Sequence, residues 1–217
     1  MSLILRLLGH ASFKLKVDEK VIYIDPYAGD DSEYAEKANL ILITHKHRDH
    51  SDPTKIALMQ DESTTILTSS DNAENLTGNV VAIDPGEKQE VEGITVYGVP
   101  GYNVIRKRDS GEPFHPREIQ TAFVIEAKGK RIYFAGDTEF IEEMKDLKDI
   151  DVALLPMDGH YTMDPKEAME AVEAIKPKMV VPMHWRDQDP KKFKADVEKK
   201  HPDIKVNVIN PGEEFQL

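Results

Sequence analysis

The chain has 217 residues, no cysteine and a formal net charge of −12. Without cysteine it forms no disulfide, no thiolate-ligated zinc site and no cysteine nucleophile, and its acidic balance argues against binding to large nucleic acids. The hydrophobic fraction of 40% is typical of a globular protein, and no apolar run approaches the roughly 20 residues of a membrane helix. We therefore predict one domain over residues 1–217, a cytoplasmic location, no membrane partner and assembly into a homo-oligomer.

Short strands dominate the first half of the chain. The apolar N-terminal segment lacks a basic leader and a cleavage site, so it predicts a strand and not a signal peptide. Asp52 and Pro53 predict the start of a helix, and Lys128–Lys130 predicts a hairpin tip. The expected strands are Leu3–Leu8, Ser12–Val17, Val21–Ile24, Leu40–Ile43, Thr64–Leu67, Val80–Ile83, Ile94–Val99, Ala122–Ala127 and Arg131–Ala135, with helices at Pro53–Gln60 and Asp71–Leu76.

Strands and helices alternate more regularly in the second half. This pattern favours an α/β (α+β) fold in which two mixed sheets pack face to face with helices outside, a four-layer αββα sandwich. The alternative is a single doubly wound sheet, but the early run of antiparallel strands counts against it. The expected helices are Phe140–Leu147, Pro165–Ile175 with Asp164 as its cap, and Pro190–Lys199; the expected strands are Val152–Leu155, Met179–Val181 and Lys205–Ile209.

The segment Thr44–His50 is the most informative part of the sequence. His45, His47, Asp49 and His50 lie within six positions, directly after the apolar run Leu40–Ile43. Histidine is the commonest ligand of transition metals in proteins, and carboxylates complete such sites. A solvated polar turn is the other interpretation, but unpaired imidazoles clustered after a buried strand are costly. The segment therefore predicts a metal site.

Four other segments also end a strand and place polar groups in the turn that follows. Their candidate residues are Asp25 before Pro26, Asp137 in a Gly-Asp-Thr turn, His160 in a loop before a helix, and His184 after Met179–Met183. Each of these has an ordinary structural explanation, such as a turn aspartate, a helix cap or a core histidine. Taken singly, none of them establishes a site.

Together, these segments resemble the metallo-β-lactamase-fold hydrolases over nearly the whole chain. The resemblance rests on the order His-x-His-x-Asp-His, Gly-Asp-Thr and then a strand-end Pro-x-His. The segments Leu8–Phe13 and Gly159–Met163 look like the branch that includes the ascorbate-6-phosphate lactonase-like proteins. The resemblance implies a first metal ion on His45 and His47, a second on Asp49, His50 and His184, and Asp137 as the bridge between them. Asp25 would orient a ligand imidazole, and His10 would either lie near the pocket or be a structural turn histidine.

The chain departs from this family at one turn. The family usually supplies a further histidine in a Pro-Gly-His-Thr turn. Here Tyr102 occupies the place of that histidine, and Asn103 follows it beside the expected pocket. His115 is the only histidine between Thr44–His50 and Asp137. We predict that it replaces the missing ligand, because zinc sites rarely lack a nitrogen donor that can reach them; a position at the pocket rim is the alternative.

The expected chemistry is hydrolysis by a metal-activated water. Two divalent cations lower the pKa of a bound water and stabilise the charge that develops. With nitrogen and oxygen donors and no sulfur, Zn²⁺ is the expected metal, and Mn²⁺ or Fe²⁺ are alternatives. Asp49, His160 or a water would protonate the leaving group. The alternative function is a non-catalytic metal-binding or ligand-sensing protein of the same fold that has lost activity with the histidine at Tyr102.

The substrate predicted from the sequence is a small ester, lactone or phosphodiester. Arg106 and Arg108 follow Tyr102 in a basic stretch, which is either a solvated turn or a site for a phosphate or carboxylate of the substrate. The net negative charge does not exclude an anionic substrate, because bound metal ions can dominate the field of one pocket.

Overall fold

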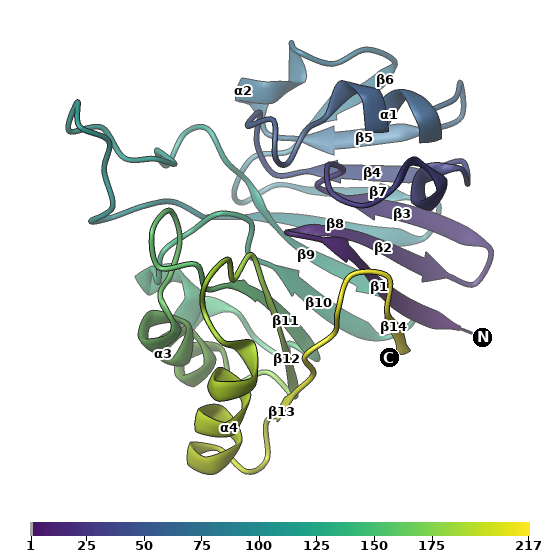
Figure 1. Cartoon of the computed structure of the whole chain (residues 1–217). Helices are drawn as coiled ribbons and strands as arrows, with labels where there is room; N and C mark the ends of the chain where they lie inside the picture. The colour runs from purple at the N-terminus through teal and green to yellow at the C-terminus, as the bar shows by residue number, and fades with distance from the viewer. Residues whose placement is uncertain (1) are drawn as a thin grey trace.

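Two seven-stranded β-sheets form the molecule (Figure 1), and the computed structural model describes residues 2–217. The first, sheet A, has in spatial order β14 (Glu214–Gln216), β1 (Leu3–Gly9), β2 (Ser12–Val17), β3 (Lys20–Ile24), β4 (Leu40–Ile43), β5 (Thr65–Thr68) and β6 (Asn79–Ala82). The second, sheet B, has β13 (Lys205–Val206), β12 (Met179–Met183), β11 (Val152–Pro156), β10 (Lys130–Phe134), β9 (Ala122–Ala127), β8 (Ile94–Val99) and β7 (Lys88–Val91). Both sheets are mixed: β1–β3 and β7–β10 are antiparallel, whereas β3–β6 and β10–β13 are parallel.

Strict alternation of side chains builds a separate apolar layer on each face of the sheets. In β4, Leu40 and Leu42 enter the central core between the sheets, while Ile41 and Ile43 face the outer layer of sheet A. Because successive side chains in a strand point to opposite faces, a strand buried on both sides reads as a continuous apolar run. The same alternation in β10 sends Phe134 to the central core and Tyr133 to the outer layer of sheet B.

Helices cover the outer face of each sheet and complete the four-layer αββα sandwich. On sheet A these are α1 (Pro53–Met59) and the 3₁₀ helix η1 (Asp31–Tyr34), which bury Ile56, Met59 and Tyr34. On sheet B they are α3 (Pro165–Ile175), α4 (Pro190–Lys200) and the 3₁₀ helix η2 (Glu142–Asp146). A further short helix, α2 (Ser70–Ala73), lies between β5 and β6.

The predicted fold is confirmed, with corrections to several elements. The helix expected over Phe140–Leu147 is only the 3₁₀ turn η2, and the last predicted strand ends at Val206 and not at Ile209. The strands β7 and β14 were not predicted, because β7 is mostly polar and β14 is very short. The N-caps Asp52 and Asp164 are confirmed: each side chain accepts a hydrogen bond from the first turn of its helix.

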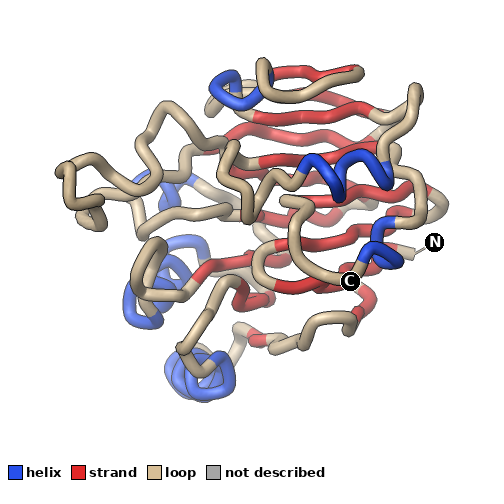
Figure 2. Tube along the Cα trace, turned by 45° about the horizontal axis from the view of Figure 1, so that its top comes forward, coloured by secondary structure: helices blue, strands red, loops and turns tan. Residues whose placement is uncertain are grey.

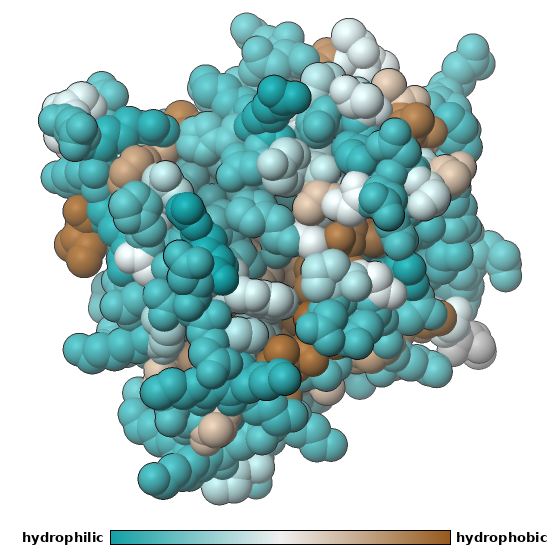
Figure 3. Space-filling view, in the orientation of Figure 1, coloured by the Kyte–Doolittle hydropathy of each residue, from teal (hydrophilic) through white to brown (hydrophobic). Residues whose placement is uncertain are grey.

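Long loops extend from one end of the two sheets, on the left in Figure 2. The longest connection, between β8 and β9, extends well beyond the strand ends and appears in teal in Figure 1. Within residues 2–217, no helix combines the length and apolar character needed to cross a bilayer. The face seen in Figure 3 is mostly hydrophilic.

Candidate metal centre

The two sheets deliver the predicted ligands to one point. The turn after β4 in sheet A carries the His-x-His-x-Asp-His segment, while Asp137 follows β10 and His184 follows β12 in sheet B. Gly136 makes this approach possible: its φ is +63°, and a Cβ at that position would lie 3.0 Å from Cγ2 of Thr44. Only glycine fits so close to the β4 turn without strain.

The first set of ligand atoms comes from His45, His47 and His115. Each histidine offers one ring nitrogen, and these three nitrogens lie within 4.8 Å of one another. Nε2 of His45 is 3.0 Å from Nδ1 of His47. His115 reaches this group from the β8–β9 connection and is buried. The structure thus places His115 beside the two histidines that it was predicted to join.

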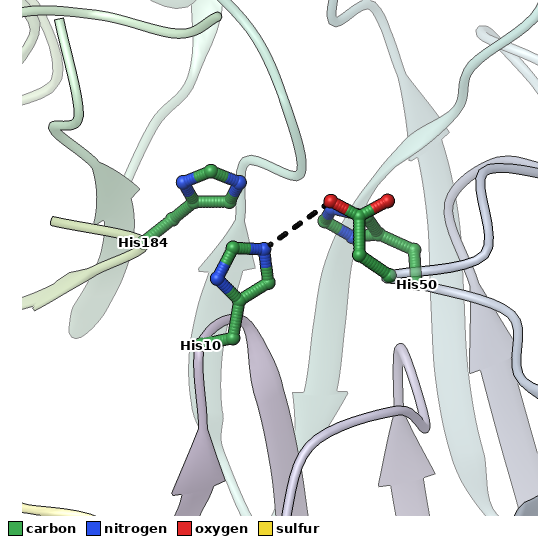
Figure 4. Close-up of side chains that lie close together, drawn as sticks. His10, His50 and His184 are labelled. Carbon is green, nitrogen blue, oxygen red and sulfur yellow. Dashed lines mark ion pairs between the residues drawn. The ribbon is translucent and has the colours of Figure 1, made fainter. Parts of the chain in front are cut away.

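The second set comes from His10, Asp49, His50 and His184, whose ligand atoms also lie within 4.8 Å of one another. Figure 4 shows His10, His50 and His184 converging, and the ion pair at 3.5 Å joins Nε2 of His10 to Oδ2 of Asp49. The rings of His10 and His184 have centroids only 3.8 Å apart. His10, in the β1–β2 turn, therefore adds a fourth possible ligand to the second set. The sequence had suggested His10 only as a residue near the pocket or a structural turn histidine.

Asp137 lies between the two sets. Its Oδ2 is 3.3 Å from Nε2 of His115 and 3.4 Å from Nε2 of His184, while its Oδ1 is 3.3 Å from Nε2 of His50. Oδ1 of Asp137 and Nε2 of His10, His50 and His184 are buried and have no hydrogen bond within the described residues 2–217. Unpartnered buried polar atoms are costly in a protein interior, and several nitrogen and oxygen atoms that converge in this way fit metal binding.

Further polar groups hold the ligand imidazoles in place. Oδ2 of Asp25 lies 2.7 Å from Nδ1 of His50, and Thr44 donates to both carboxylate oxygens of Asp25. Asp158 faces His184 in a similar position: its Oδ2 lies 3.3 Å from Nδ1 of His184, as an ion-pair contact without a hydrogen bond. Such partners fix which ring nitrogen faces a metal. The sequence analysis did not identify Asp158, although Asp158 lies in the same loop as the candidate His160.

Three residues of the centre have strained backbones. The φ angles of His10, Asp25 and His184 are +53°, +46° and +46°. This left-handed region costs about 1–3 kcal/mol for a residue other than glycine, and such strain clusters at functional sites. His184 also donates its backbone N–H to the carbonyl of His10 at 3.1 Å, which joins the two sheets directly at the site.

Burial and nearby charges shift the histidine pKa values in opposite directions in the two ligand sets. Burial lowers the pKa of His45 well below its usual value and that of His115 to about 4, so both are neutral donors. Burial also opposes charge on His184, but the carboxylates of Asp137 and Asp158 outweigh it and raise its pKa to about 9. Asp137 is buried too, and the neighbouring His184 and His50 nevertheless keep its pKa well below the usual range. The centre therefore holds an ionised carboxylate between imidazoles.

The remaining candidates lie around this centre. Tyr102 points away from it, since its hydroxyl contacts Glu143 at 3.0 Å. Arg106 pairs with Glu167 at 2.6 Å and with Glu139 at 3.1 Å, so its charge is already neutralised. His160 is exposed and, together with Arg106, Arg108, Phe114 and Tyr161, lines a cavity beside the metal centre.

The metal centre opens into a cavity of about 350 Å³. The cavity is lined by His47, Asp49, His115 and Asp137 and by Arg48, Arg108, Phe114 and Tyr161. Its size suits a small molecule.

Residues 4–184 match the family described as the Beta-lactamase superfamily domain. The chain belongs to the β-lactamase superfamily. Within this superfamily it groups with the UPF0173 metal-dependent hydrolases: it is 37% identical to the protein of Thermococcus onnurineus, with 98% of both chains covered. It is 31% identical to the protein of Methanopyrus kandleri, covering 96% of this chain and 97% of that one. The solved structure of Igni18, a metallo hydrolase from Ignicoccus hospitalis, superposes with a TM-score of 0.85 at 28% identity, over 100% of this chain and 99% of that one.

Proposed function

We propose that this superfamily member hydrolyses an ester, lactone or phosphodiester bond of a small molecule with a water activated by two divalent metal ions. The observation that carries the proposal is the position of Asp137, whose carboxylate lies within 3.4 Å of ring nitrogens from both ligand sets. A carboxylate in that position can bridge two cations. The first ion would be held by His45, His47 and His115, and the second by His10, Asp49, His50 and His184.

When bound, such a pair of ions supplies a nucleophilic hydroxide near neutral pH and stabilises the negative charge of the transition state. Nitrogen and oxygen donors without sulfur favour Zn²⁺, with Mn²⁺ and Fe²⁺ as alternatives. The protein orients the ligands: Asp25, Thr44 and Asp158 contact the imidazoles, and a buried apolar core lies behind them.

Proton movement falls to groups at the edge of the cavity. Burial would raise the pKa of Asp49, but contact with His10 and the charge of His50 outweigh it and lower the pKa to about 2. Asp49 is therefore ionised near neutral pH and suits a ligand or a proton acceptor. His160 is exposed in the adjoining cavity, where it can donate a proton to a leaving group that extends outward.

The non-catalytic alternative arises from the missing histidine at Tyr102. The position of His115, which completes a three-histidine set with His45 and His47, supports the hydrolase over that alternative.

The proposal is tested by metal content and hydrolysis on the same preparations. Metal-free protein is reloaded with Zn²⁺, Mn²⁺ or Fe²⁺, its metal content is measured, and it is assayed on lactones, bis-nitrophenyl phosphate and thioesters. We expect close to two ions per chain and hydrolysis of one of these classes. Asp137→Asn should abolish hydrolysis, whereas His201→Ala, which removes a histidine paired with Glu173 outside the centre, should not. A preparation that binds no metal would refute the proposal.

A further inference from the structure

The arginines of this chain divide into two groups. Four of the seven lie within 4.0 Å of a carboxylate: Arg6 with Glu33, Arg106 with Glu167, Arg117 with Glu143 and Arg131 with Glu126. In the part of the chain that the structure describes, residues 2–217, the other three have no such partner; they are Arg48, Arg108 and Arg186. Carboxylates are abundant, since the chain has 40 acidic residues, and an aspartate follows each of these three arginines directly.

Two of the three unpaired arginines line the metal cavity, and the third packs beside its wall. Arg48 and Arg108 line the cavity itself. The guanidinium of Arg186 lies 5.2 Å from the ring centre of Tyr161, another residue of the cavity wall. The three come from separate loops, after β4, before β9 and after β12, so no single run of basic sequence explains why they meet.

Aromatic rings hold two of these guanidinium groups in place. Arg108 lies 5.3 Å from the ring centre of Phe114, and Phe114 contacts Tyr161 edge to face at 4.8 Å. Arg108, Phe114, Tyr161 and Arg186 thus form a continuous row along the rim. Nη2 of Arg108 also donates a hydrogen bond to the carbonyl of Phe114 at 3.2 Å. A guanidinium packed on a ring presents its remaining N–H donors at its edge, and those donors match the geometry of carboxylate and phosphate groups.

We propose that Arg48 and Arg108, with Arg186 beside them, bind an oxyanion, a carboxylate or phosphate, that the substrate carries away from the bond that is cleaved. This inference rests on the proposed hydrolase function, because the metal centre occupies the inner end of the same cavity. The neutralised Arg106 takes no part in this binding; it joins the rim loops by pairing with Glu139 and Glu167. In a chain with a net charge of −12, this rim offers an anion three cations that internal carboxylates leave free.

The first test compares two substrates that differ in charge. p-Nitrophenyl acetate is neutral, whereas the mono-p-nitrophenyl ester of glutaric acid carries a free carboxylate at its far end. We expect Arg48→Gln and Arg108→Gln to lower the ratio of kcat/KM for the charged ester to kcat/KM for the neutral ester about tenfold, mainly through the KM of the charged ester. The matched control is Arg131→Gln, which removes an arginine stacked on Tyr97 in a different cavity. If the preference for the charged ester were the same in all variants, the proposal would be wrong.

The second test measures binding without hydrolysis. Metal-loaded protein is titrated calorimetrically with glutarate and, separately, with inorganic phosphate. Weaker binding of either anion to Arg48→Gln and Arg108→Gln than to the wild type and Arg131→Gln supports the rim site, and the tighter of the two anions identifies the group recognised. Equal affinity in all four proteins means that the anions bind elsewhere and overturns the proposal. This result stands even if neither ester is hydrolysed, an outcome that would count against the hydrolase function alone.

Discussion

Oδ1 of Asn103 accepts two hydrogen bonds from His115, one from its backbone N–H at 2.8 Å and one from its ring Nδ1 at 2.7 Å. The amide of Asn103 is oriented by a third bond, in which Nδ2 donates to the carbonyl of Tyr161. Because an amide oxygen only accepts, Nδ1 of His115 must carry the proton. Nε2 is then left unprotonated, with a lone pair that can bind a metal ion, and it faces Asp137.

His115→Ala should therefore reduce the metal content from two ions per chain to one, while Asn103→Ala should weaken the same site by about 10–100-fold. Metal analysis and competition with a chelator measure both effects. Tyr102→Phe is the control and should retain both ions, because the hydroxyl it loses contacts Glu143 outside the centre. Unchanged stoichiometry in His115→Ala would show that His115 is not a ligand.

Asp158→Asn should weaken the other site. One oxygen of Asp158 accepts N–H groups of His160, Tyr161 and Thr162, and the other faces the ring of His184. The amide preserves the shape of the loop but removes the charge that orients and polarises His184, so we expect about 10–100-fold weaker metal binding. Asp203→Asn, an exposed change outside the site, is the control. Equal affinities in the two variants would count against this role of Asp158.

Glu139 contacts the first part of the β8–β9 connection. Its carboxylate accepts the consecutive N–H groups of Val104, Ile105 and Arg106 at 2.6–2.7 Å and also pairs with the side chain of Arg106. Glu139→Ala should lower the free energy of unfolding by roughly 2–3 kcal/mol and speed proteolysis within residues 104–114. Glu143→Ala, which removes a more exposed carboxylate bound to Tyr102 and Arg117, should have a smaller effect. Protease resistance equal to that of the wild type would contradict this.

The contribution of Asp151 to stability should depend on pH. Burial opposes its charge, but the ammonium of Lys178 and the N–H of Arg131 outweigh this and lower its pKa below the usual 3.8. The folded state therefore binds the proton less tightly than the unfolded state, and the carboxylate stabilises the fold above pH 3.8. Asp151→Asn should cost about 1 kcal/mol near pH 7, and this difference should shrink as the pH falls below 3.8.

Denaturant unfolding at several pH values measures this effect. The matched control is Asp149→Asn, at an exposed neighbouring position. The backbone of Asp149 is left-handed, and asparagine also tolerates that conformation. A difference between wild type and Asp151→Asn that stays constant down to acid pH would contradict the assignment.

Local patterns in the sequence predicted the sandwich and the convergence of its strand ends. Runs such as Leu40–Ile43 are buried on both faces, which reveals strands between two layers, and polar residues directly after them had to meet at one edge. The groups that orient the ligands were harder to predict. Asp158 and Asn103 lie in irregular loops, where only the folded backbone determines which polar atoms meet.

The basic stretch after Tyr102 shows the same difficulty. Arg106 and Arg108 are only two positions apart in the same basic run. Glu139 and Glu167 neutralise the charge of Arg106, whereas Arg108 lines the cavity without an ion-pair partner among the described residues. Sequence alone gave them the same role, because ion pairs between distant segments have no local signature. Arg48 was overlooked because it lies among His45, His47, Asp49 and His50, which were all interpreted as metal ligands.

Every ligand set spans the gap between the sheets. His184 of sheet B joins His10, Asp49 and His50 of sheet A, and His115 joins His45 and His47 in the same way. An ion held by both sheets binds the docked arrangement and not the separated sheets, so it stabilises docking by about 2.7 kcal/mol when free metal exceeds its dissociation constant a hundredfold. Chelation should accordingly speed hydrogen exchange along the central core first, because removal of the metal would lower the stability of the sandwich as well as the proposed hydrolysis.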